Sequence, residues 1–304
     1  MSVQILIDKW SFYSQIYLYS IIAPDIYVFG AMFYFKEKKE MTKAQKFLQE
    51  TKKYNHSTDL LKDIYGIDSK AEYDAVVLAP SWTAAKIYKH TEVKETLLVK
   101  HSTFSSYEVE VNGKKLAWIQ TGMGASNMVD TALCLAESVV EKVIFLGAVG
   151  AIQPEILIGE LATPTVSLSY GSAVGYLQDK LADGCAVKEV APDNMAFVEE
   201  VLKEAGKQGI AMKKRKVFCT DSIMCEYIHL PEIKETGAEL IEMETAGFYE
   251  CINAMEKKGI ALLCVSDNSA ADIALVMRDE ESTKRYKTAR EEYIPQLIDL
   301  ICEL

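Results

Sequence analysis

The spacing of apolar residues along the chain changes near residue 70. Before that point, apolar positions recur at helical spacing, which predicts two helices, over 41–54 and 57–66. The segment His56-Ser-Thr-Asp59 supplies N-cap side chains for the second helix, and Gly66 is suited to end it. After that point, short apolar runs alternate with helical patterns, which is typical of an α/β sheet covered by helices.

The apolar runs after residue 70 predict a sheet of mixed strand direction. Asn112-Gly113 lies between two alternating segments and is a strong signal for a tight antiparallel hairpin. Apolar runs that are bounded by turn residues predict buried strands. The predicted strands cover 74–80, 94–99, 104–111, 115–121, 142–146, 160–168, 215–219 and 260–265. The predicted helices cover 83–90, 128–140, 193–206, 232–239, 244–257 and 279–302.

These patterns divide the chain into three parts. We predict one α/β domain with a mixed central β-sheet flanked by helices over 71–304. A helical segment over 41–70 and an aromatic-rich extension over 1–40 precede this domain. No linker, repeat or low-complexity block interrupts the sequence after residue 70, so a second large domain is not expected.

The extension does not match the rest of the chain. Residues 10–35 are aromatic-rich and carry one charge, Asp25, which is expensive at the centre of a membrane span, as is the break at Pro24. No basic start with a small-residue cleavage site marks a signal peptide. Three interpretations stay open: a weak membrane anchor, a packed extension, or sequence upstream of a start at Met41. The last two fit the residues better, so we predict no membrane association and assign the segment no function.

Composition narrows the class of protein. The 304 residues include 33 Lys and Arg against 44 Asp and Glu, a net charge of −11, and 49% of them are apolar. This mix is typical of a globular protein, and the acidic balance argues against nucleic-acid binding. Seven cysteines without a CxxC pair predict free, mostly buried thiols in a reducing compartment, hence a cytoplasmic protein. The histidines have no metal-ligand spacing, so we predict no metal and no other cofactor.

Two glycine-rich segments are candidates for ligand binding. Thr121-Gly122-Met-Gly-Ala-Ser126 lies between a strand and a helix N-terminus, where backbone N–H groups can bind an anion. Gly147-Ala148-Val-Gly150 follows an apolar strand, at the sheet edge where ligands bind in open α/β sheets. The alternative for each segment is a plain tight turn. A dinucleotide site is not favoured, because Asn127 stands where the third glycine is needed.

Two acidic segments are candidates for binding and catalysis. Glu242-Met243-Glu244 begins a predicted helix, and a buried carboxylate there can accept two hydroxyl protons from a sugar diol. Ser266-Asp267-Asn268 ends an apolar strand, where desolvation raises a carboxyl pKa and favours a general acid. The alternatives are a helix-dipole charge for the first segment and a helix N-cap for the second.

The order and spacing of these segments resemble the hexameric branch of the nucleoside phosphorylase family. That branch includes uridine phosphorylase, bacterial purine nucleoside phosphorylase and the methylthioadenosine/adenosylhomocysteine nucleosidases. The resemblance runs from about Tyr73 to the C-terminus. The segments that carry it are His101-Ser-Thr-Phe104, Thr121-Gly-Met-Gly124, Gly147-Ala-Val-Gly-Ala-Ile-Gln-Pro154, Gly159-Glu160, Phe218-Cys-Thr-Asp221, Ile241-Glu-Met-Glu-Thr-Ala-Gly247 and Val265-Ser-Asp267.

The resemblance implies cleavage of the N-glycosidic bond between ribose and a base, through a ribose with oxocarbenium character. It implies that Asp267 protonates N7 of a purine, and that Glu244 and Met243 bind the ribose. It also implies a homo-oligomer, a dimer or a trimer of dimers, in which His101 contacts ribose across a subunit interface.

For the base, the resemblance points to Phe218, Ile223 and Asp267. Family members place an aromatic residue near position 223, so stacking on the base is expected to be weaker here. Relatives that cleave uridine lack the acidic residue of position 267 and bind the pyrimidine with a Gln–Arg pair. Glu226 stands near the Gln position, so we expect a purine-type base.

The residues that would bind the nucleophile depart from the family pattern. Phosphorolytic members use a Gly-Asp-Pro-x-Arg loop, which here is Pro80–Ala85, and two further Arg positions hold Ser102 and Phe145. Three charge-assisted hydrogen bonds of about 1.5–3 kcal/mol each are thereby lost, which leaves phosphate weakly held. Hydrolytic members use a Glu in that loop and an Arg where Leu263 stands. The residues expected around the nucleophile are Ser81, Thr121, Gly122, Gly147 and Ala148, with Thr83, Lys86 and Lys100 as substitute donors.

The sequence thus predicts an enzyme that cleaves the N-glycosidic bond of a small-molecule purine-type nucleoside. Phosphorolysis, with inorganic phosphate as co-substrate, is the family default, and hydrolysis is the alternative. A non-catalytic nucleoside binder on the same fold is the alternative from another class. In that protein Asp267 and Glu244 would serve recognition only.

Overall fold

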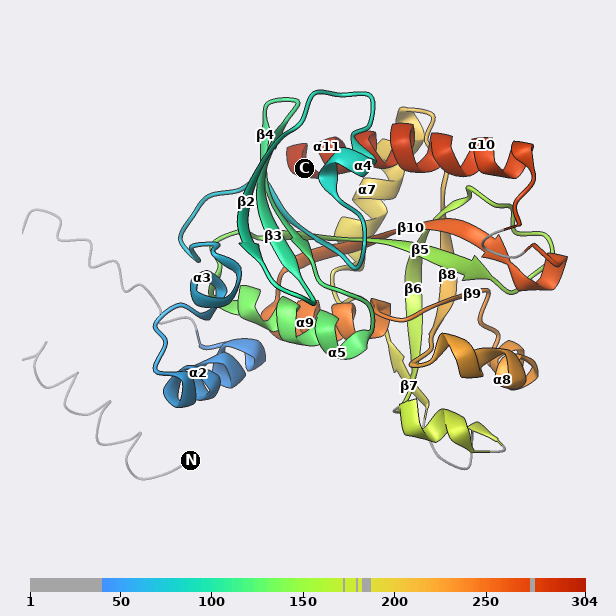
Figure 1. The fold of residues 1–304 in the computed structure, drawn as a ribbon, viewed down its shortest axis with the longest axis horizontal. Helices are drawn as coiled ribbons and strands as arrows, with labels where there is room; N and C mark the ends of the chain where they lie inside the picture. The colour runs from blue at the N-terminus through green and yellow to red at the C-terminus, as the bar shows by residue number, and fades with distance from the viewer. Residues whose placement is uncertain (1–39, 172, 179, 182–186, 274–276) are drawn as a thin grey trace, which may run out of the picture. The chain divides into compact units, whose positions relative to one another are not determined.

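The predicted apolar runs form one mixed ten-stranded sheet in a computed structural model of the chain (Figure 1). The structure describes residues 40–171, 173–178, 180–181, 187–273 and 277–304. The strands are β1 (Ala75–Ala79), β2 (Lys94–Lys100), β3 (Ser105–Val111), β4 (Lys114–Gln120), β5 (Lys142–Ala151), β6 (Leu161–Tyr170), β7 (Val187–Val190), β8 (Met212–Cys219), β9 (Leu240–Glu242) and β10 (Lys258–Asn268). The α-helices are α2 (Lys43–Asn55), α3 (Leu60–Tyr65), α4 (Ala84–Ile87), α5 (Ala125–Leu133), α7 (Met195–Lys207), α8 (Ile223–Glu235), α9 (Thr245–Met255), α10 (Glu280–Thr288) and α11 (Ile294–Glu303). Short 3-10 helices are η1 (Cys134–Glu137), η2 (Ala173–Leu177) and η3 (Ser269–Ala271), and the π-helical turn η4 (Ala289–Tyr293) joins α10 to α11.

Five strands close into a ring of paired neighbours. β5 pairs in parallel with β10, β10 antiparallel with β6, β6 in parallel with β8, β8 in parallel with β9, and β9 antiparallel with β5. β1 pairs in parallel with both β5 and β4, and the sheet continues through β3 to β2. β10 meets β6 at Leu263 and Cys264, so the carboxyl ends of β5 and β10 diverge from β6 and β8 beyond that point (Figure 1).

Helices cover both faces of the sheet (Figure 1). α5 and α9 pack against each other with α2 on α9, while α7 packs against α11 and α4 against η4. Most buried apolar side chains join one large core. A second, smaller core supports α8 and consists of Ile152, Leu168, Tyr176, Leu181, Phe218, Ile233, Ala238 and Ile241.

Two predicted helices have the wrong bounds. The helix predicted over 232–239 is instead α8, which covers 223–235. It begins earlier because the Ser222 side chain caps its first turn. Pro231, a residue that favours a break, lies inside this helix. The helix predicted up to residue 140 leaves α-geometry after Leu133, and Val139 is 53% exposed. The backbone N–H of Val139 bonds instead to the carbonyl oxygen of Ser69. β7 and β9 are short strands that the apolar pattern did not predict.

The segment Gly147–Gly150 is not a turn but part of β5, paired in parallel with β10. A Cβ atom at Gly147 would lie 2.8 Å from the ring of Phe145, and one at Gly150 would lie 3.0 Å from Oδ2 of Asp267. These two glycines therefore allow side chains to approach the strand closely.

Residues 41–304 form one compact unit, and α2 and α3 contribute Leu48, Leu60 and Leu61 to the large core. The aromatic-rich segment over 10–35 lies outside the described residues, as does Cys185. In the described part of the chain, none of the helices has the length and apolar character needed to span a bilayer. The six described cysteines are free, and all but Cys225 are buried, as predicted.

The close approach at Gly159 gives a stability prediction. Gly159 has φ +87°, and a Cβ atom there would lie 2.6 Å from the backbone of Arg285 in α10. Gly159→Ala should therefore lower the free energy of unfolding by about 2–4 kcal/mol, measured by urea denaturation. The matched control is Gly206→Ala in α7, where the Cβ meets nothing within 4 Å. That change should raise stability by about 0.5–1 kcal/mol. Equal urea midpoints for Gly159→Ala and Gly206→Ala would contradict the close packing of α10 against Gly159.

Candidate active site

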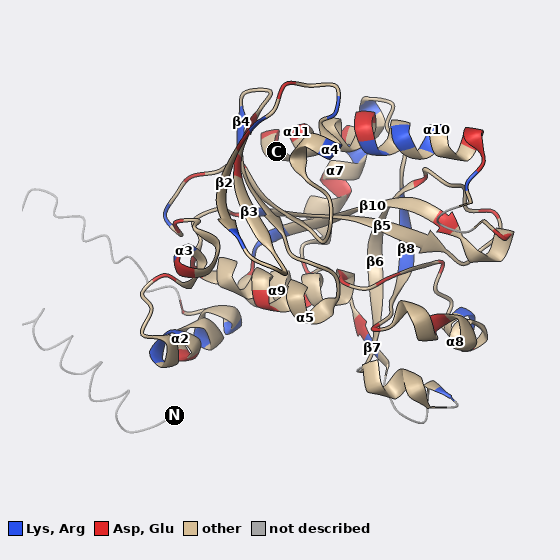
Figure 2. Cartoon of the chain, viewed as in Figure 1, with Lys and Arg blue, Asp and Glu red and all other residues tan. Residues whose placement is uncertain are grey.

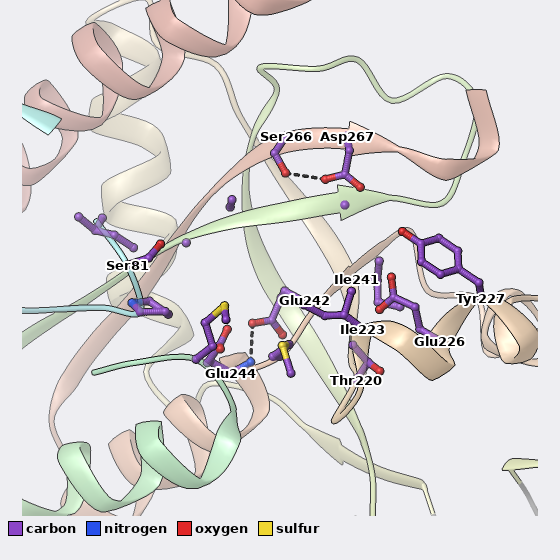
Figure 3. Close-up of a pocket in the computed structure, with 17 residues that line it drawn as sticks. Ser81, Thr220, Ile223, Glu226, Tyr227, Ile241, Glu242, Glu244, Ser266 and Asp267 are labelled. Atoms are coloured by element: carbon purple, nitrogen blue, oxygen red, sulfur yellow. Dashed lines mark hydrogen bonds between the residues drawn. The ribbon is translucent and has the colours of Figure 1, made fainter. Parts of the chain in front are cut away.

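A pocket of about 300 Å³ opens where the sheet splits (Figure 3). It lies at the carboxyl ends of the strands, because residues that end or follow β1, β5, β8, β9 and β10 all line it. This is the edge at which ligands bind in open α/β sheets. The residues that line it are Pro80, Ser81, Met123, Leu146, Gly147, Ala148, Gly150, Thr220, Ile223, Glu226, Tyr227, Ile241, Glu242, Met243, Glu244, Ser266 and Asp267.

Asp267 faces this pocket from β10 (Figure 3). Neighbours along a strand point to opposite faces, yet Ser266 and Asp267 both line the pocket. A register shift between Val265 and Asp267 explains this, since a bulge re-aims the side chains beside it. The Ser266 hydroxyl donates a hydrogen bond to Oδ1 of Asp267 at 2.6 Å. Burial raises the pKa of Asp267, while that hydrogen bond and the charge of Arg278 oppose the rise. Asp267 can therefore retain a proton to higher pH than an exposed carboxyl group.

Glu242 lines the pocket and caps the start of α9. Its Oε2 accepts the backbone N–H groups of Glu244 and Thr245, at 2.7 and 2.9 Å. Its Oε1 accepts the Thr245 hydroxyl and the Cys219 thiol, both at 2.7 Å. With both oxygens occupied by protein donors, Glu242 fixes the path of the chain through Met243 and Glu244. Burial raises the pKa of Glu242 despite these donors.

Glu244 joins the glycine-rich segment to the pocket. Its Oε1 accepts the backbone N–H of Gly124 at 2.6 Å, which ties the turn before α5 to the start of α9. A backbone hydrogen bond from Met243 also reaches this carboxyl group. Burial and then the neighbouring Glu242 raise the pKa of Glu244 to about 8. A carboxyl group with this pKa is ready to accept hydroxyl hydrogen bonds from a sugar once it is ionised.

Glu226 forms the far wall of the pocket, from the first turns of α8 (Figure 3). The Ser222 side chain caps this helix by accepting the Cys225 N–H at 3.3 Å. Glu226 is only 8% exposed, and burial together with nearby Asp267 raises its pKa to about 7. Tyr227 brings an aromatic ring to the same wall, next to Ile223.

The structure gathers most of the predicted site residues in this pocket. Those that line it are Ser81, Ile223, Met243, Glu244, Asp267, Gly147 and Ala148. Phe218 does not line it. The ring of Phe218 is fully buried, and its centroid lies 5.1 Å from that of the Tyr170 ring. We therefore no longer expect Phe218 to contact a base.

Thr121, Gly122 and His101 also lie outside the pocket lining. From the glycine-rich turn, Met123 faces the pocket instead, because Gly122 at φ +74° packs against the carbonyl oxygen of Thr103. His101 is exposed and stacks on Phe104 with ring centroids 4.9 Å apart. Its contribution to a neighbouring subunit stays a prediction.

Sequence reasoning gave no role to Glu242 or Ser266, and it placed Glu226 only near the Gln position of the family. Glu226 was not expected on a helix, because the pattern placed α8 nine residues too late. Glu242 and Ser266 stand within motifs that the sequence does single out, directly beside Glu244 and Asp267. Only the cap of α9 and the bulge in β10 show what they do.

The described lining of the pocket carries no positive charge, because none of its residues is Lys, Arg or His. Thr83 uses its hydroxyl to cap α4 by accepting the Lys86 N–H at 3.2 Å. Lys86 lies near Arg290, and burial and the Arg290 charge lower its pKa, but neither residue lines the pocket. Several Lys and Arg residues instead belong to α2, α10 and β8 (Figure 2).

Fold and site together define an α/β protein with a carboxyl-lined pocket at the strand ends. Residues 74–301 match the phosphorylase superfamily, and the chain belongs to this family. A purine nucleoside phosphorylase of the DeoD type from Limosilactobacillus reuteri (strain DSM 20016) is 24% identical over 178 residues, 58% of this chain and 70% of that protein.

Two solved structures show how closely the fold is shared. The 5′-methylthioadenosine/S-adenosyl homocysteine nucleosidase of Campylobacter jejuni aligns with a TM-score of 0.60 at 18% identity, covering 76% of this chain and 99% of that one. AMP nucleosidase from Bacteroides thetaiotaomicron VPI-5482 aligns with a TM-score of 0.55 at 18% identity, covering 85% and 100%. At 18% sequence identity, the similarity to these two structures shows a shared fold.

The raised pKa of Glu244 gives a pH-dependent stability. The folded protein holds this proton up to a pKa of about 8, whereas the unfolded chain releases it near the ordinary 4.5. The contribution of the protonated Glu244 to the free energy of unfolding is therefore complete below the ordinary pKa of 4.5, and it is lost as the pH rises towards 8. Relative to Glu244→Gln, which does not titrate, the wild type should lose stability between pH 5 and 8, by at most about 1.4 kcal/mol per pH unit. Urea denaturation across this range measures it. The control is Glu200→Gln at an exposed position, whose free energy of unfolding should follow that of the wild type at each pH. A difference in free energy of unfolding between the wild type and Glu244→Gln that stays constant with pH would contradict the raised pKa.

Proposed function

We propose that this protein cleaves the N-glycosidic bond of a purine-type nucleoside. The observation that carries the proposal is the pairing of Asp267 and Glu244 in one pocket, on different walls, each with a pKa raised by burial. A carboxyl group that keeps its proton can act as general acid to a leaving base. A second carboxyl group can hold the two hydroxyl groups of ribose.

In the proposed reaction the bond between C1′ of ribose and N9 of the base breaks. Asp267 gives its proton to N7, so the base leaves neutral, and Asp267 becomes a carboxylate. The ribose ring gains positive charge as the bond lengthens. Four carboxyl groups line the pocket, those of Glu226, Glu242, Glu244 and Asp267, and the carboxylate left on Asp267 after its proton transfer adds negative charge near the developing cation.

We favour water over phosphate as the nucleophile. The oxygen of water would bond to C1′ and release a proton to solvent, giving free ribose and free base. A phosphate dianion in the same place would face the pocket carboxyl groups without a lining Lys, Arg or His among the described residues. Phosphate recognition ordinarily rests on such charge-assisted donors. Phosphorolysis remains the family default and the outcome to compare.

Substitution at Asp267 and Glu244 tests the assignment of the site. Asp267→Asn keeps the acceptor for Ser266 but removes the transferable proton, and should lower kcat for base release by about 10²–10⁴-fold. Glu244→Ala should abolish measurable turnover by removing the ribose acceptor. Base release from purine nucleosides is followed by chromatography, with Glu200→Gln as control. Wild-type rates in both variants would overturn the assignment. If the wild type only binds nucleosides and both variants merely weaken that binding, the protein is a non-catalytic binder.

The nucleophile is tested by running the same release with and without inorganic phosphate. Hydrolysis predicts equal rates in the two conditions and free ribose as the sugar product. Release that requires phosphate, with a phosphorylated sugar as product, would show that groups outside the described lining bind the anion. That result would refute water as the nucleophile while leaving the roles of Asp267 and Glu244 intact.

A further inference from the structure

We propose that Cys219 is a positioning residue for Glu244. Its thiol caps the start of α9 together with Glu242, so that the Glu244 side chain faces the pocket instead of capping its own helix. Cys219 ends β8 and does not line the pocket. The inference rests on the proposed function where it names ribose as the ligand of Glu244.

The first observation is that α9 begins without the usual cap. A helix start leaves its first N–H groups without partners inside the helix, and the side chain at the N-cap position ordinarily accepts one of them. Glu244 holds the N-cap position of α9, but its side chain makes no capping hydrogen bond. It lines the pocket and accepts the N–H of Gly124 (Figure 3). Other groups must therefore satisfy the start of α9.

Glu242 and Cys219 supply that cap. Oε2 of Glu242 accepts the N–H groups of Glu244 and Thr245. Sγ of Cys219 accepts the next N–H along the helix, that of Ala246, at 3.2 Å. A buried backbone N–H without a partner is costly, so the sulfur has a bonding role and does not merely fill space. One side chain at the end of β8 thereby holds the first turn of α9.

The thiol also completes the hydrogen bonding of Glu242. Cys219 donates to Oε1 of Glu242 at 2.7 Å, and the Thr245 hydroxyl donates to the same oxygen. Because the Thr245 hydrogen is committed there, the Ser167 hydroxyl, 2.8 Å away, donates to Thr245. Every donor in this buried network points towards Glu242, which stabilises its carboxylate form. The thiol thus fixes both the position and the charge of the residue that precedes Met243 and Glu244.

The network lies on one side of the site. Asp267 belongs to β10 and has its own partner, the Ser266 hydroxyl. Loss of the Cys219 thiol should therefore displace Glu244 and leave Asp267 in place. In the proposed reaction a nucleoside contacts both carboxyl groups, whereas a free base contacts Asp267 without Glu244. The affinities for a nucleoside and for its base therefore report on the two residues separately.

The test compares base release from adenosine with binding of adenine. Cys219→Ala removes the donor and the acceptor together, and should raise KM for adenosine about tenfold while Kd for adenine changes by less than about twofold. Because Asp267 still transfers its proton, kcat should fall by less than about fivefold. Cys219→Ser keeps a donor and an acceptor, and should bring KM to within about threefold of the wild type. Cys251→Ala is the matched control, because it removes a buried thiol of α9 that does not cap the helix, and it should change none of these values.

A second measurement needs no ligand. Amide hydrogen exchange at Thr245 and Ala246 should be about tenfold faster in Cys219→Ala than in the wild type, because the start of α9 opens more readily without the thiol. Cys219→Ser should restore slow exchange, and Cys251→Ala should not alter it. Retained binding of adenine shows that a variant is folded.

Two results would overturn the inference: an unchanged KM for adenosine in Cys219→Ala, or unchanged exchange at the start of α9. Equal losses of adenosine and adenine binding would also refute it, because they would show a general structural role of the thiol. If the wild type releases no base, the proposed function fails, and Kd for adenosine takes the place of KM in the same comparison. If the wild type binds no nucleoside either, hydrogen exchange alone decides whether Cys219 holds the start of α9.

Discussion

The site depends on one constraint: carboxyl groups that share a buried pocket must each be neutralised by a proton or by hydrogen-bond donors. Glu242 meets it with donors from α9 and Cys219, and in doing so sets the position of Glu244. Glu244 and Glu226 meet it with protons, which is why burial and their carboxyl neighbours raise both pKa values, to about 8 and about 7. A ligand that brings hydroxyl and N–H donors can take over from those protons.

The fold supplies this constraint through two irregular features. The ring of five strands opens beyond the contact of β10 with β6, and the pocket occupies the opening. The bulge in β10 then turns both Ser266 and Asp267 inward, so that the hydroxyl can hold the carboxyl group. Gly150 on the paired strand leaves space for Asp267, since a Cβ atom there would press on its oxygen. A regular sheet of the same strands would not place these groups together.

The sequence predicts the sheet well because its strands are long apolar runs with clear turns, such as Asn112-Gly113, where both residues adopt positive φ. It also identifies Asp267 and Glu244, which stand in distinctive motifs. It fails where local and tertiary signals conflict. Pro231 suggests a break, yet α8 continues through it because its buried side chains pack on the second core. For the same reason Glu226 is not predicted to lie on a helix. The bulge in β10 leaves no mark in the apolar pattern of 260–265.

The separation of the two cores has a consequence for how such a protein can change. The elements that position Glu244 and Asp267, α9 and β10, pack in the large core, whereas α8, which carries Glu226, rests on the small one. Because Ile233 of α8 belongs to the small core, a substitution there can shift α8 while the packing of α9 and β10 in the large core stays intact. The two cores thus let one wall of the pocket vary in evolution while the opposite wall is retained.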